Sequence, residues 1–561
     1  MSETKIFEAP GLGIWELDNS HFSRPMSLFS EELFTNSLVQ GLKEGTDRYG
    51  LALSHLSYAM VNGFFYKKAV LCGVSDDHFG ALPDNLFSRS EIISRLERGK
   101  KALESKLWRE DLKRWDNEVK PDSIARNKRI QAISPKNLSD QLLIQHLIDC
   151  RKNALEMMYR HHVFTIPAIL PIGLYISMVR EWTGLESSES LYLLKGSTPV
   201  SKGAADNELD SLVNCLKREN FAPEEFVGKS STEILEAIRS RAGSVTNNAL
   251  NEYLNFVGFR LITGYDITDK FGFDMLDVVI SNIWNKFNLL NIDDNEELLN
   301  EKIESVRDQV PDKYKLEFNS LLNEARMVNR LRDERGVYND VLGTGLARRV
   351  VLEVGLRLET QGFISDPELI LHASYNEMLL LLERKSGSLD SDLINRARWF
   401  NANTVDDAPL ILGGESAAPK PPLTMFPEIS RPGMIALFTA INEIYDEHES
   451  ISKENEIISG VPVSSGSYEG TARIICSLED FGNLTQGDIL VTKNTTAAFN
   501  IILPLLGAIV TDRGGQLSHA AIVSREYGIP AVVSTGSATK IIKDGMRIKV
   551  DGSAGTVEIL S

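Results

Sequence analysis

Apolar residues recur at helical spacing over most of residues 27–400. In runs such as Leu143–Cys150 and Tyr375–Leu382, apolar side chains return every three or four positions, and charged or capping residues fill the gaps. This period places the apolar side chains on one face of a helix. The region is therefore predicted to be mostly helical.

Two stretches interrupt the helical period. Residues 11–26 contain two glycines, one proline and no sustained period, which is typical of a structured loop that carries a binding surface. Residues 406–427 hold five prolines and a pair of adjacent glycines, which would break a helix. We therefore expect a linker at 406–459 that contains one amphipathic helix, at about 433–450.

The pattern changes from residue 460 onward, where short β-branched runs are separated by Gly, Asp and Asn turns. One helical segment is expected at His519–Tyr527. The expected strands are Thr471–Cys476, Asp488–Thr492, Gly507–Thr511, Ala531–Ser534 and Arg547–Val550. The predicted fold class is therefore multidomain: a large, mostly α-helical domain over 1–405, followed by a compact α/β, β-rich domain over 460–561.

Composition and charge exclude several classes of protein. With 42% apolar and 25% charged residues, the chain resembles a soluble globular protein, and no stretch approaches the ~18 apolar residues of a membrane span. The N-terminus lacks a secretion signal, so we expect a cytoplasmic protein with no membrane partner. The net charge of -18 disfavours nucleic acid as a partner. The scattered cysteines are expected to be buried thiols: Cys72, Cys150, Cys215 and Cys476.

The segment Val510–Val533 carries the clearest chemistry. A strand ends at the turn formed by Gly514 and Gly515, Ser518 can cap the helix that follows, and His519 occupies its first turn. The N–H groups and the positive dipole end of a helix N-terminus favour phosphate, and would stabilise a phosphorylated imidazole. Taken alone, however, a histidine near a helix start is more commonly a capping or buried residue.

Four ordered motifs over about 100 residues change this interpretation: Gly460–Arg473, Gly487–Thr492, Val510–Val533 and Asp551–Glu558. Together they resemble the mobile, swivelling phosphohistidine domain of the phosphoenolpyruvate-utilising enzymes. This family includes pyruvate phosphate dikinase, phosphoenolpyruvate synthase, enzyme I of the sugar phosphotransferase system, rifampicin phosphotransferase and phenylphosphate synthase. The resemblance implies that His519 is the phosphorylated histidine and that Gly514, Gly515 and Ser518 form its immediate shell. Leu517 stands where the dikinases and enzyme I usually have threonine, which is closer to the rifampicin phosphotransferase and phenylphosphate synthase branches.

The helical region more weakly resembles the antibiotic-binding domain of rifampicin phosphotransferase. The matching landmarks are Trp15, His21 with Arg24-Pro25, Glu252–Arg260, Leu331–Arg335 with Arg349, and Arg396 with Pro409. The resemblance implies a domain that binds a small acceptor. Neither an ATP-grasp module nor a (β/α)₈ pattern is recognisable, so we expect a separate ATP-grasp subunit as the partner that binds ATP and Mg²⁺. No metal site is expected on this chain, because no carboxylate cluster suggests one.

An acceptor site needs a general base, cationic groups and apolar walls. His161 and His162 adjoin an apolar stretch, but adjacent helical residues point about 100° apart, so at most one is expected to face a site. A structural or surface role is the alternative for both. His21 and Arg24, in the loop beside Trp15, are equally open between a binding role and a structural one.

Four charged residues are candidates for a phosphate or carboxylate clamp, because guanidinium presents a planar fork of donors: Arg260, Arg332, Glu334 and Arg335. Charged runs on helices are more commonly solvated faces or pairs four residues apart. We favour that alternative for Arg332–Arg335.

The leading hypothesis is a dikinase-like phosphotransferase component. It would carry a phosphoryl group on His519 from the nucleotide site of a partner to a small hydroxylated or enolisable acceptor bound in the helical domain. One alternative is a non-catalytic binding or regulatory protein that retains the phosphohistidine domain. Another is lyase or dehydratase chemistry on a phosphorylated intermediate. The Gly-Gly-x-x-Ser-His array favours transfer, because packing alone would not require histidine. Transfer also leads us to expect an accessible ring nitrogen on His519 and only modest contacts between the two parts.

Overall fold

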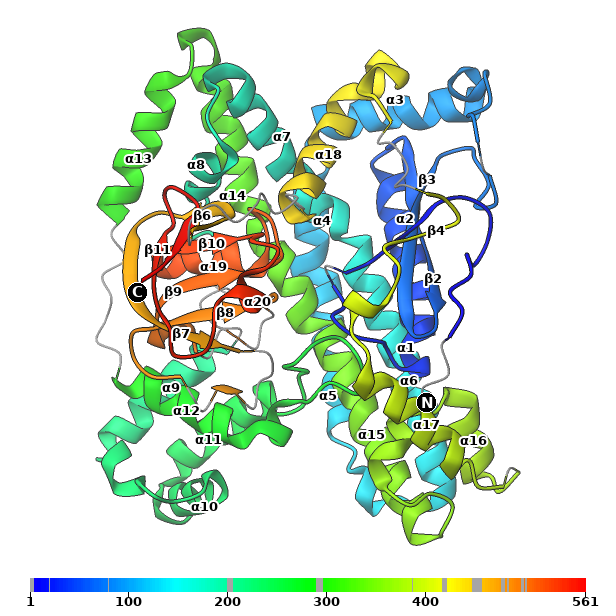
Figure 1. Ribbon diagram of the computed structural model, residues 1–561, viewed down its shortest axis with the longest axis vertical. Helices are drawn as coiled ribbons and strands as arrows, with labels where there is room; N and C mark the ends of the chain where they lie inside the picture. Colours follow the sequence, from blue (N-terminus) through cyan, green and yellow to red (C-terminus); the bar gives the residue numbers. More distant parts are fainter. Residues whose placement is uncertain are drawn as a thin grey trace. The chain divides into compact units, whose positions relative to one another are not determined.

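The structure is a computed structural model that describes residues 5–19, 21–78, 80–198, 205–288, 296–385, 387–415, 421–445, 457–475, 480–481, 484–495, 499 and 502–560. The chain divides into two compact units. The first comprises residues 1–170, 264–269 and 335–435, and the second comprises residues 171–263, 270–334 and 436–561. Helices dominate and the last part of the chain is β-rich (Figure 1), which confirms the predicted fold class. The domain boundaries at 405 and 460 remain a prediction.

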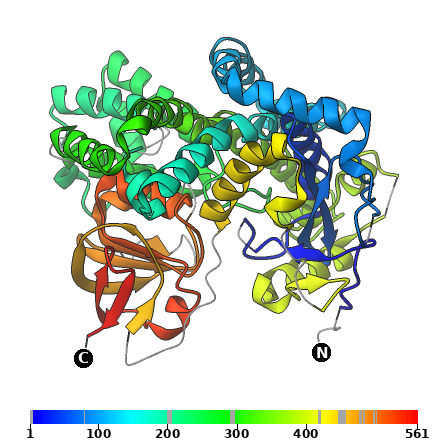
Figure 2. The same cartoon turned by 90° about the horizontal axis from the view of Figure 1, so that it is seen from above.

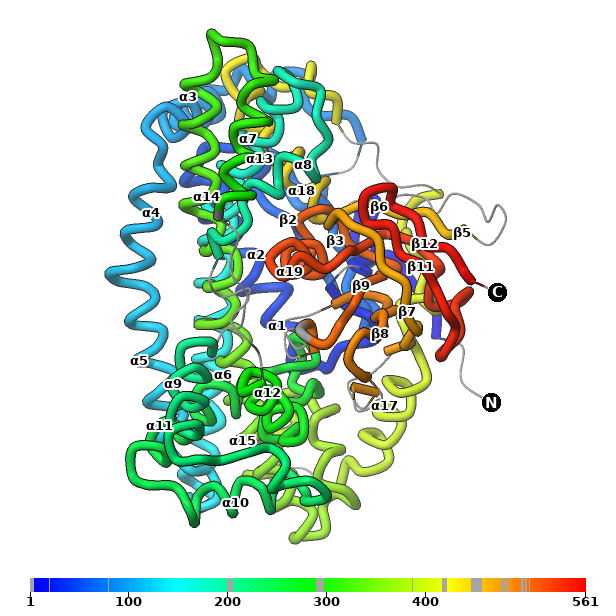
Figure 3. The backbone as a smooth tube through the Cα atoms, turned by 90° about the vertical axis from the view of Figure 1, so that its left-hand side faces the viewer, coloured from blue at the N-terminus to red at the C-terminus, as the bar shows by residue number. Residues whose placement is uncertain are grey.

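The first unit packs helices around an antiparallel sheet with the strand order β2-β3-β1-β4. The strands are Trp15–Leu17 (β1), Leu53–Val61 (β2), Phe64–Leu71 (β3) and Ile411–Leu412 (β4). The helices are Leu28–Glu32 (α1), Val39–Arg48 (α2), Ser90–Glu104 (α3), Trp108–Arg114 (α4), Lys120–Gln131 (α5), Asp140–Val163 (α6), Asp340–Thr360 (α15), Tyr375–Leu382 (α16) and Asp390–Ala402 (α17). Helices α6 and α15 lie side by side (Figure 3), and their apolar faces contribute to the largest part of this unit's core.

The hairpin of β2 and β3 contradicts the prediction of helix across this part of the chain. Asn62 and Gly63 form the two-residue turn between paired Val61 and Phe64, and both have positive φ, 54° and 89°. An Asn-Gly pair between strand-forming residues favours such a turn, because asparagine and glycine tolerate that conformation. Local turn chemistry therefore outweighs the helical pattern on either side.

The second unit combines helices with the β-rich domain. Its helices are Thr165–Thr183 (α7), Ser187–Tyr192 (α8), Asp206–Arg218 (α9), Ser231–Arg241 (α10), Ser244–Val257 (α11), Leu276–Asn288 (α12), Glu296–Gln309 (α13), Lys315–Tyr338 (α14), Arg431–Tyr445 (α18), His519–Tyr527 (α19) and Ala538–Ile541 (α20). Helices α7, α14 and α18 also contribute residues to the first unit. Helix α18 confirms the helix expected in the linker.

The β-rich domain is an eight-stranded mixed sheet of order β5-β12-β11-β7-β8-β9-β10-β6. Its strands, red and orange in Figure 2, are Ile457–Ser459 (β5), Val461–Ser464 (β6), Ser467–Ile474 (β7), Asp488–Thr492 (β8), Leu506–Thr511 (β9), Ala531–Val533 (β10), Arg547–Asp551 (β11) and Thr556–Ile559 (β12). Strands β7 to β10 run parallel to one another, whereas β7 pairs antiparallel with β11 and β10 pairs antiparallel with β6. The expected strands and helix His519–Tyr527 are confirmed to within a few residues.

Both faces of the central strands are buried, which explains their continuous apolar sequences. In β8, Ile489 and Val491 belong to one core cluster while Leu490 belongs to the other. Helix α19 covers the face that carries Leu490, where it contacts β9 and β10, and α20 packs on the opposite face.

The α19 side of the sheet also takes up residues from the helical part of the second unit. Ile262, Met275 and Val278 belong to the same core cluster as Leu490 and the α19 residues Ala520, Ala521 and Val523. The expectation of only modest contacts is therefore wrong for this part of the chain. Helix α19 is short, so the apolar surface around it needs further cover.

One helical stretch, Asp140–Thr183, is long and apolar enough to cross a membrane by length and composition alone. However, 72% of its most apolar window is buried inside the protein, as in the core helix of a soluble protein. The cytoplasmic location remains a prediction.

The turn before α19 generates a test of the fold at the site. Gly514 has a φ of 109°, and a Cβ there would lie 2.8 Å from Cβ of Ser518, whereas Gly545 has a φ of 82° with nothing within 4 Å of the same position. We expect Gly545→Ala to lower the free energy of unfolding by about 1 kcal/mol because of its positive φ. Gly514→Ala should lower it by a further ~1–3 kcal/mol, because the methyl group displaces the helix cap. Urea unfolding of both variants measures the difference, and equal losses would contradict this account.

Candidate functional site

His519 is presented by a turn between β9 and α19 that forms as predicted. Ser518 is the N-cap of α19, and its Oγ accepts a hydrogen bond from the N–H of Ala521 at 3.3 Å. The helix ends at Gly528, which has the left-handed conformation typical of a helix C-terminus. His519 therefore lies on the first turn of a helix that is capped at both ends.

The imidazole of His519 has two different ring nitrogens. Nδ1 lies 2.9 Å from Oγ1 of Thr495, whereas Nε2 is buried and has no hydrogen-bond partner. We expected an accessible ring nitrogen, and for Nε2 this is wrong in the state described. Burial, followed by the nearby guanidinium of Arg332, lowers the pKa of His519 from 6.5 to about 3. The ring is therefore neutral near pH 7, and Nδ1–H donation to Thr495 would leave the lone pair on Nε2.

The amides of the Gly-Gly turn are bound by the end of α18. The N–H of Gly515 donates to the carbonyl of Ile444 at 3.2 Å, and the N–H of Leu517 donates to the carbonyl of Glu443 at 2.7 Å. The carboxylate of Glu443 in turn accepts hydrogen bonds from Arg180 at 2.7 Å and Ser187 at 2.5 Å. These contacts hold the turn against the helices of its own unit.

A buried arginine supports the turn from within the domain. Arg525 donates to the carbonyl of Gln516, and also to its Oε1 at 3.2 Å, while Nε2 of Gln516 donates to the carbonyl of Pro462 at 2.6 Å. Burial, assisted by Arg332, lowers the pKa of Arg525 to about 9. Arg525 therefore keeps its proton near neutral pH and fixes the segment before His519.

Of the four candidate clamp residues, Arg332 is the one that lies near His519. It influences both His519 and Arg525 electrostatically. Glu334 instead pairs with Arg330, four residues earlier, at 2.9 Å, as the favoured alternative predicted. Arg260 folds back onto its own segment, 3.7 Å from the ring centroid of Phe256. Arg335 belongs to the first unit.

In the first unit, Arg335 lies with the predicted histidines. Nδ1 of His161 lies 2.7 Å from Oδ1 of Asp340, and the rings of His161 and His162 approach to 4.5 Å. Both rings thus belong to one cluster, with their planes tilted by 35°. That at most one of them faces a site remains a prediction. Arg335 donates to the carbonyl of His161, and His21 contributes electrostatically to the low pKa of both histidines.

Arg24 lies elsewhere and has a structural role. It forms an ion pair with Asp269, and its guanidinium lies 4.4 Å from the ring centroid of Phe400. These contacts hold residues 264–269 within the first unit. The structural alternative therefore fits Arg24.

Thr495 and Asp340 are the site residues that sequence reasoning missed. Thr495 follows β8, and the turn before His519 follows β9, which runs parallel to β8. Loops after neighbouring parallel strands meet at the same edge of a sheet, so this topology was a usable signal. Asp340 had no such signal, because its contact with His161 joins residues 179 positions apart.

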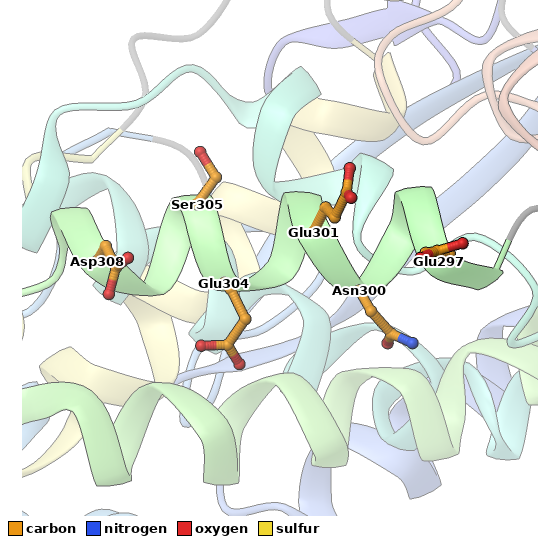
Figure 4. A pocket seen from close by; sticks show the side chains of 6 residues that line it. All are labelled: Glu297, Asn300, Glu301, Glu304, Ser305 and Asp308. Carbon is orange, nitrogen blue, oxygen red and sulfur yellow. The ribbon is translucent and has the colours of Figure 1, made fainter.

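Other possible sites are less informative. Among the described residues, no group of three His, Cys, Asp or Glu side chains could hold a metal ion. Cys72, Cys150 and Cys215 are buried thiols as expected, while Cys476 lies outside the described residues. An open depression is lined by side chains of α13 alone (Figure 4): Glu297, Asn300, Glu301, Glu304, Ser305 and Asp308. This acidic surface would repel a phosphoryl group.

Comparison with known proteins supports the phosphohistidine site. Residues 484–555 match the family described as PEP-utilising enzyme, mobile domain. The chain is 30% identical to the uncharacterized phosphotransferase YvkC of Bacillus subtilis over 324 residues, which cover 56% of this chain and 36% of that protein. It is 50% identical to a rifampicin phosphotransferase of Bacillus cereus over 105 residues, which cover 19% of this chain and 12% of that protein.

A further relative matches a similar length of this chain. The chain is 46% identical to a phosphoenolpyruvate synthase of Aeropyrum pernix over 112 residues, which cover 20% of this chain and 14% of that protein. The chain thus spans little more than a third, or less, of the length of these relatives. We conclude that residues 484–555 are similar to the mobile domain of PEP-utilising enzymes, and that the chain shares partial similarity with phosphotransferases that include a rifampicin phosphotransferase and a phosphoenolpyruvate synthase.

Proposed function

We propose that the chain is a phosphotransferase component that carries a phosphoryl group on Nε2 of His519 to a small acceptor. The observation that carries the proposal is a neutral imidazole on the first turn of α19, with Nδ1 held by Thr495 and Nε2 without a partner. Buried ring nitrogens normally find hydrogen bonds, so an unpartnered Nε2 suits a nitrogen reserved for another bond.

The chemistry is two successive phosphoryl transfers. In the first, the lone pair of Nε2 attacks the donor phosphorus, an N–P bond forms and the donor's P–O bond breaks. In the second, an acceptor oxygen attacks the same phosphorus, the N–P bond breaks, and the proton of the acceptor hydroxyl passes to a base. Dividing one difficult transfer into two steps is the general advantage of a covalent intermediate.

Arg332 is the residue best placed to respond to the phosphoryl group. A cation near a neutral imidazole makes protonation harder, as the low pKa of His519 reflects. The same cation would stabilise a phosphorylated imidazole, because guanidinium binds phosphoryl oxygens through charged hydrogen bonds.

The donor and acceptor are also part of the proposal. We infer a nucleotide site with ATP and Mg²⁺ on a separate ATP-grasp subunit, and a small hydroxylated or enolisable acceptor in the helical part. The names of the relatives, rifampicin phosphotransferase and phosphoenolpyruvate synthase, support small molecules of this kind. Because Nε2 is buried in the state described, the β-rich domain would have to leave its contacts to exchange the group.

One observation favours the non-catalytic alternative. Ile262, Met275 and Val278 share a core with the β-rich domain, and a permanent interface would look the same. Variants of His519 separate the two functions.

His519→Ala and His519→Gln should abolish phosphoryl transfer in a system reconstituted with the donor, because neither side chain can carry the group. Either change removes the hydrogen bond with Thr495 together with the buried, unpartnered Nε2, so we expect it to alter the free energy of unfolding by no more than about 1 kcal/mol. The readout is radiolabel transferred to acceptor, with His78→Gln as the control. Retention of more than a few per cent of the wild-type rate would exclude covalent catalysis at His519 and favour the binding protein.

Arg332→Gln should slow transfer through His519 by about 10–100-fold, the effect of losing a charged hydrogen bond. It should also raise the pKa of His519, because a nearby positive charge is removed. Arg330→Gln is the matched control, since Arg330 lies on the same helix and pairs with Glu334. Single-turnover rates and histidine NMR titrations measure the two effects, and equal behaviour of the variants would remove Arg332 from the proposal.

The isolated chain should not phosphorylate His519 when incubated with ATP or phosphoenolpyruvate. Addition of an ATP-grasp partner should produce acid-labile phosphate on the chain, detected by mass spectrometry at neutral pH. Efficient self-phosphorylation from ATP alone would show that a nucleotide site lies within this chain.

A further inference from the structure

Three imidazoles gather in the first unit, away from His519 in the sequence. The imidazole cluster consists of His21, His161, His162, Asp340 and Arg335, which come from the loop after β1, from α6, from the start of α15 and from α14. Four separate segments of the chain thus converge on one small group of titratable side chains. The phosphohistidine mechanism described above uses none of them.

Each imidazole in the cluster is held through the same ring nitrogen. Nδ1 of His161 lies 2.7 Å from the carboxyl of Asp340, and Nδ1 of His162 lies 3.3 Å from Oγ1 of Thr165. Nδ1 of His21 lies 2.9 Å from the buried carboxylate of Asp18. A histidine whose Nδ1–H is held by a carboxylate presents its lone pair on Nε2, the arrangement of a general base.

Burial favours the uncharged forms of His161, His162 and Asp340. Burial, then Arg335 and His21, lowers the pKa of His161 well below 6.5. The pKa of His162 is also lowered well below 6.5, by burial, by His161 and by the same two neighbours. Burial raises the pKa of Asp340 from 3.8 to about 7, although Arg335 opposes the shift.

Further charges reach the cluster through Asp18. Its buried carboxylate also contacts the hydroxyl of Tyr58 at 3.0 Å and the ammonium of Lys67 at 3.5 Å. Asp18 thus joins Tyr58 and Lys67 to the hydrogen-bond network of the cluster.

Packing alone does not account for this arrangement. Burying polar groups requires that each be hydrogen-bonded, and apolar side chains would fill the space of His161, His162 and Asp340 without that requirement. The side chain of His161 is 15% exposed, so the cluster is not sealed completely from the surface. A metal site does not fit either, because no three ligating side chains among the described residues are suitably arranged.

We propose that the imidazole cluster is the general acid–base site for an alcohol or phenol acceptor, with His161 as the base and Asp340 as its positioning residue. The inference rests on the proposed function. The acceptor hydroxyl gives its proton to Nε2 of His161, its oxygen bonds to the phosphorus carried by His519, and the N–P bond breaks. Asp340 stabilises the imidazolium through Nδ1–H. A carboxylate or phosphate acceptor needs no such base, because it has already lost its proton at neutral pH.

Histidine NMR on the full chain tests the proton arrangement without any acceptor. The ring nitrogens of His161 should report a neutral ring with Nδ1–H at pH 6.5 and below, and should sense a titration near pH 7 from Asp340. Asp340→Asn should abolish that titration. Asp76→Asn, which disrupts the more exposed pair of His55 and Asp76, should leave it intact. An ordinary titration of His161 near pH 6.5 would overturn the inference.

Single-turnover discharge tests the catalytic role. The full chain is phosphorylated chemically with phosphoramidate, with His519→Gln as the background control, and then mixed with glycerol, phenol or acetate. Discharge to glycerol or phenol should rise with pH through about 7, because ionised Asp340 favours proton uptake by His161. His161→Gln and Asp340→Asn should load normally but discharge at least about 100-fold more slowly, and Asp340→Asn should lose the pH dependence.

The outcomes separate the two proposals. Equal rates of discharge by the wild type and both variants would overturn the role of His161 as the general base, and would leave the proposed function standing. Discharge to acetate alone would overturn the class of acceptor. Failure of wild type to load or discharge His519 at all would overturn the proposed function itself.

Discussion

A reactive nitrogen kept away from water is the constraint on which the β-rich domain depends. Nε2 of His519 is buried without a partner, and leaving a buried polar atom unsatisfied costs about 1–3 kcal/mol. The rest of the turn offsets this cost: Thr495 holds Nδ1, Ser518 caps the helix, and α18 binds the backbone amides. The fold thus satisfies the polar groups around the imidazole with hydrogen bonds and leaves Nε2 without a partner.

Burial shifts a pKa in opposite directions at the two histidine sites, downward for His519 and upward for Asp340. At His519, burial and Arg332 keep the ring neutral and nucleophilic. In the imidazole cluster, burial raises the pKa of Asp340 to about 7, so a proton can be gained or lost under ordinary conditions. One site is suited to hold a phosphoryl group, and the other is suited to receive a proton.

The β-rich domain was predictable because its signals are local. Its strands alternate with glycine and aspartate turns, and Ser518, His519 and Gly528 mark the start and end of α19. The hairpin of β2 and β3 was missed because the surrounding helical pattern was given more weight than the Asn62-Gly63 turn. The role of Asp340 could not be predicted from the sequence, because its partner His161 lies 179 residues away and only tertiary packing joins them.

The core around α19 contains residues from both the β-rich domain and the helical part of the second unit, and this restricts any movement of the β-rich domain. Its apolar surface is completed by Ile262, Met275 and Val278, which come from the helical part of the second unit. If the domain moved into water, that surface would lose its cover, and apolar area is unfavourable when exposed. If the proposed function requires the domain to move, that movement must exchange one apolar contact surface for another, and the rate of transfer would depend on how closely the successive surfaces match.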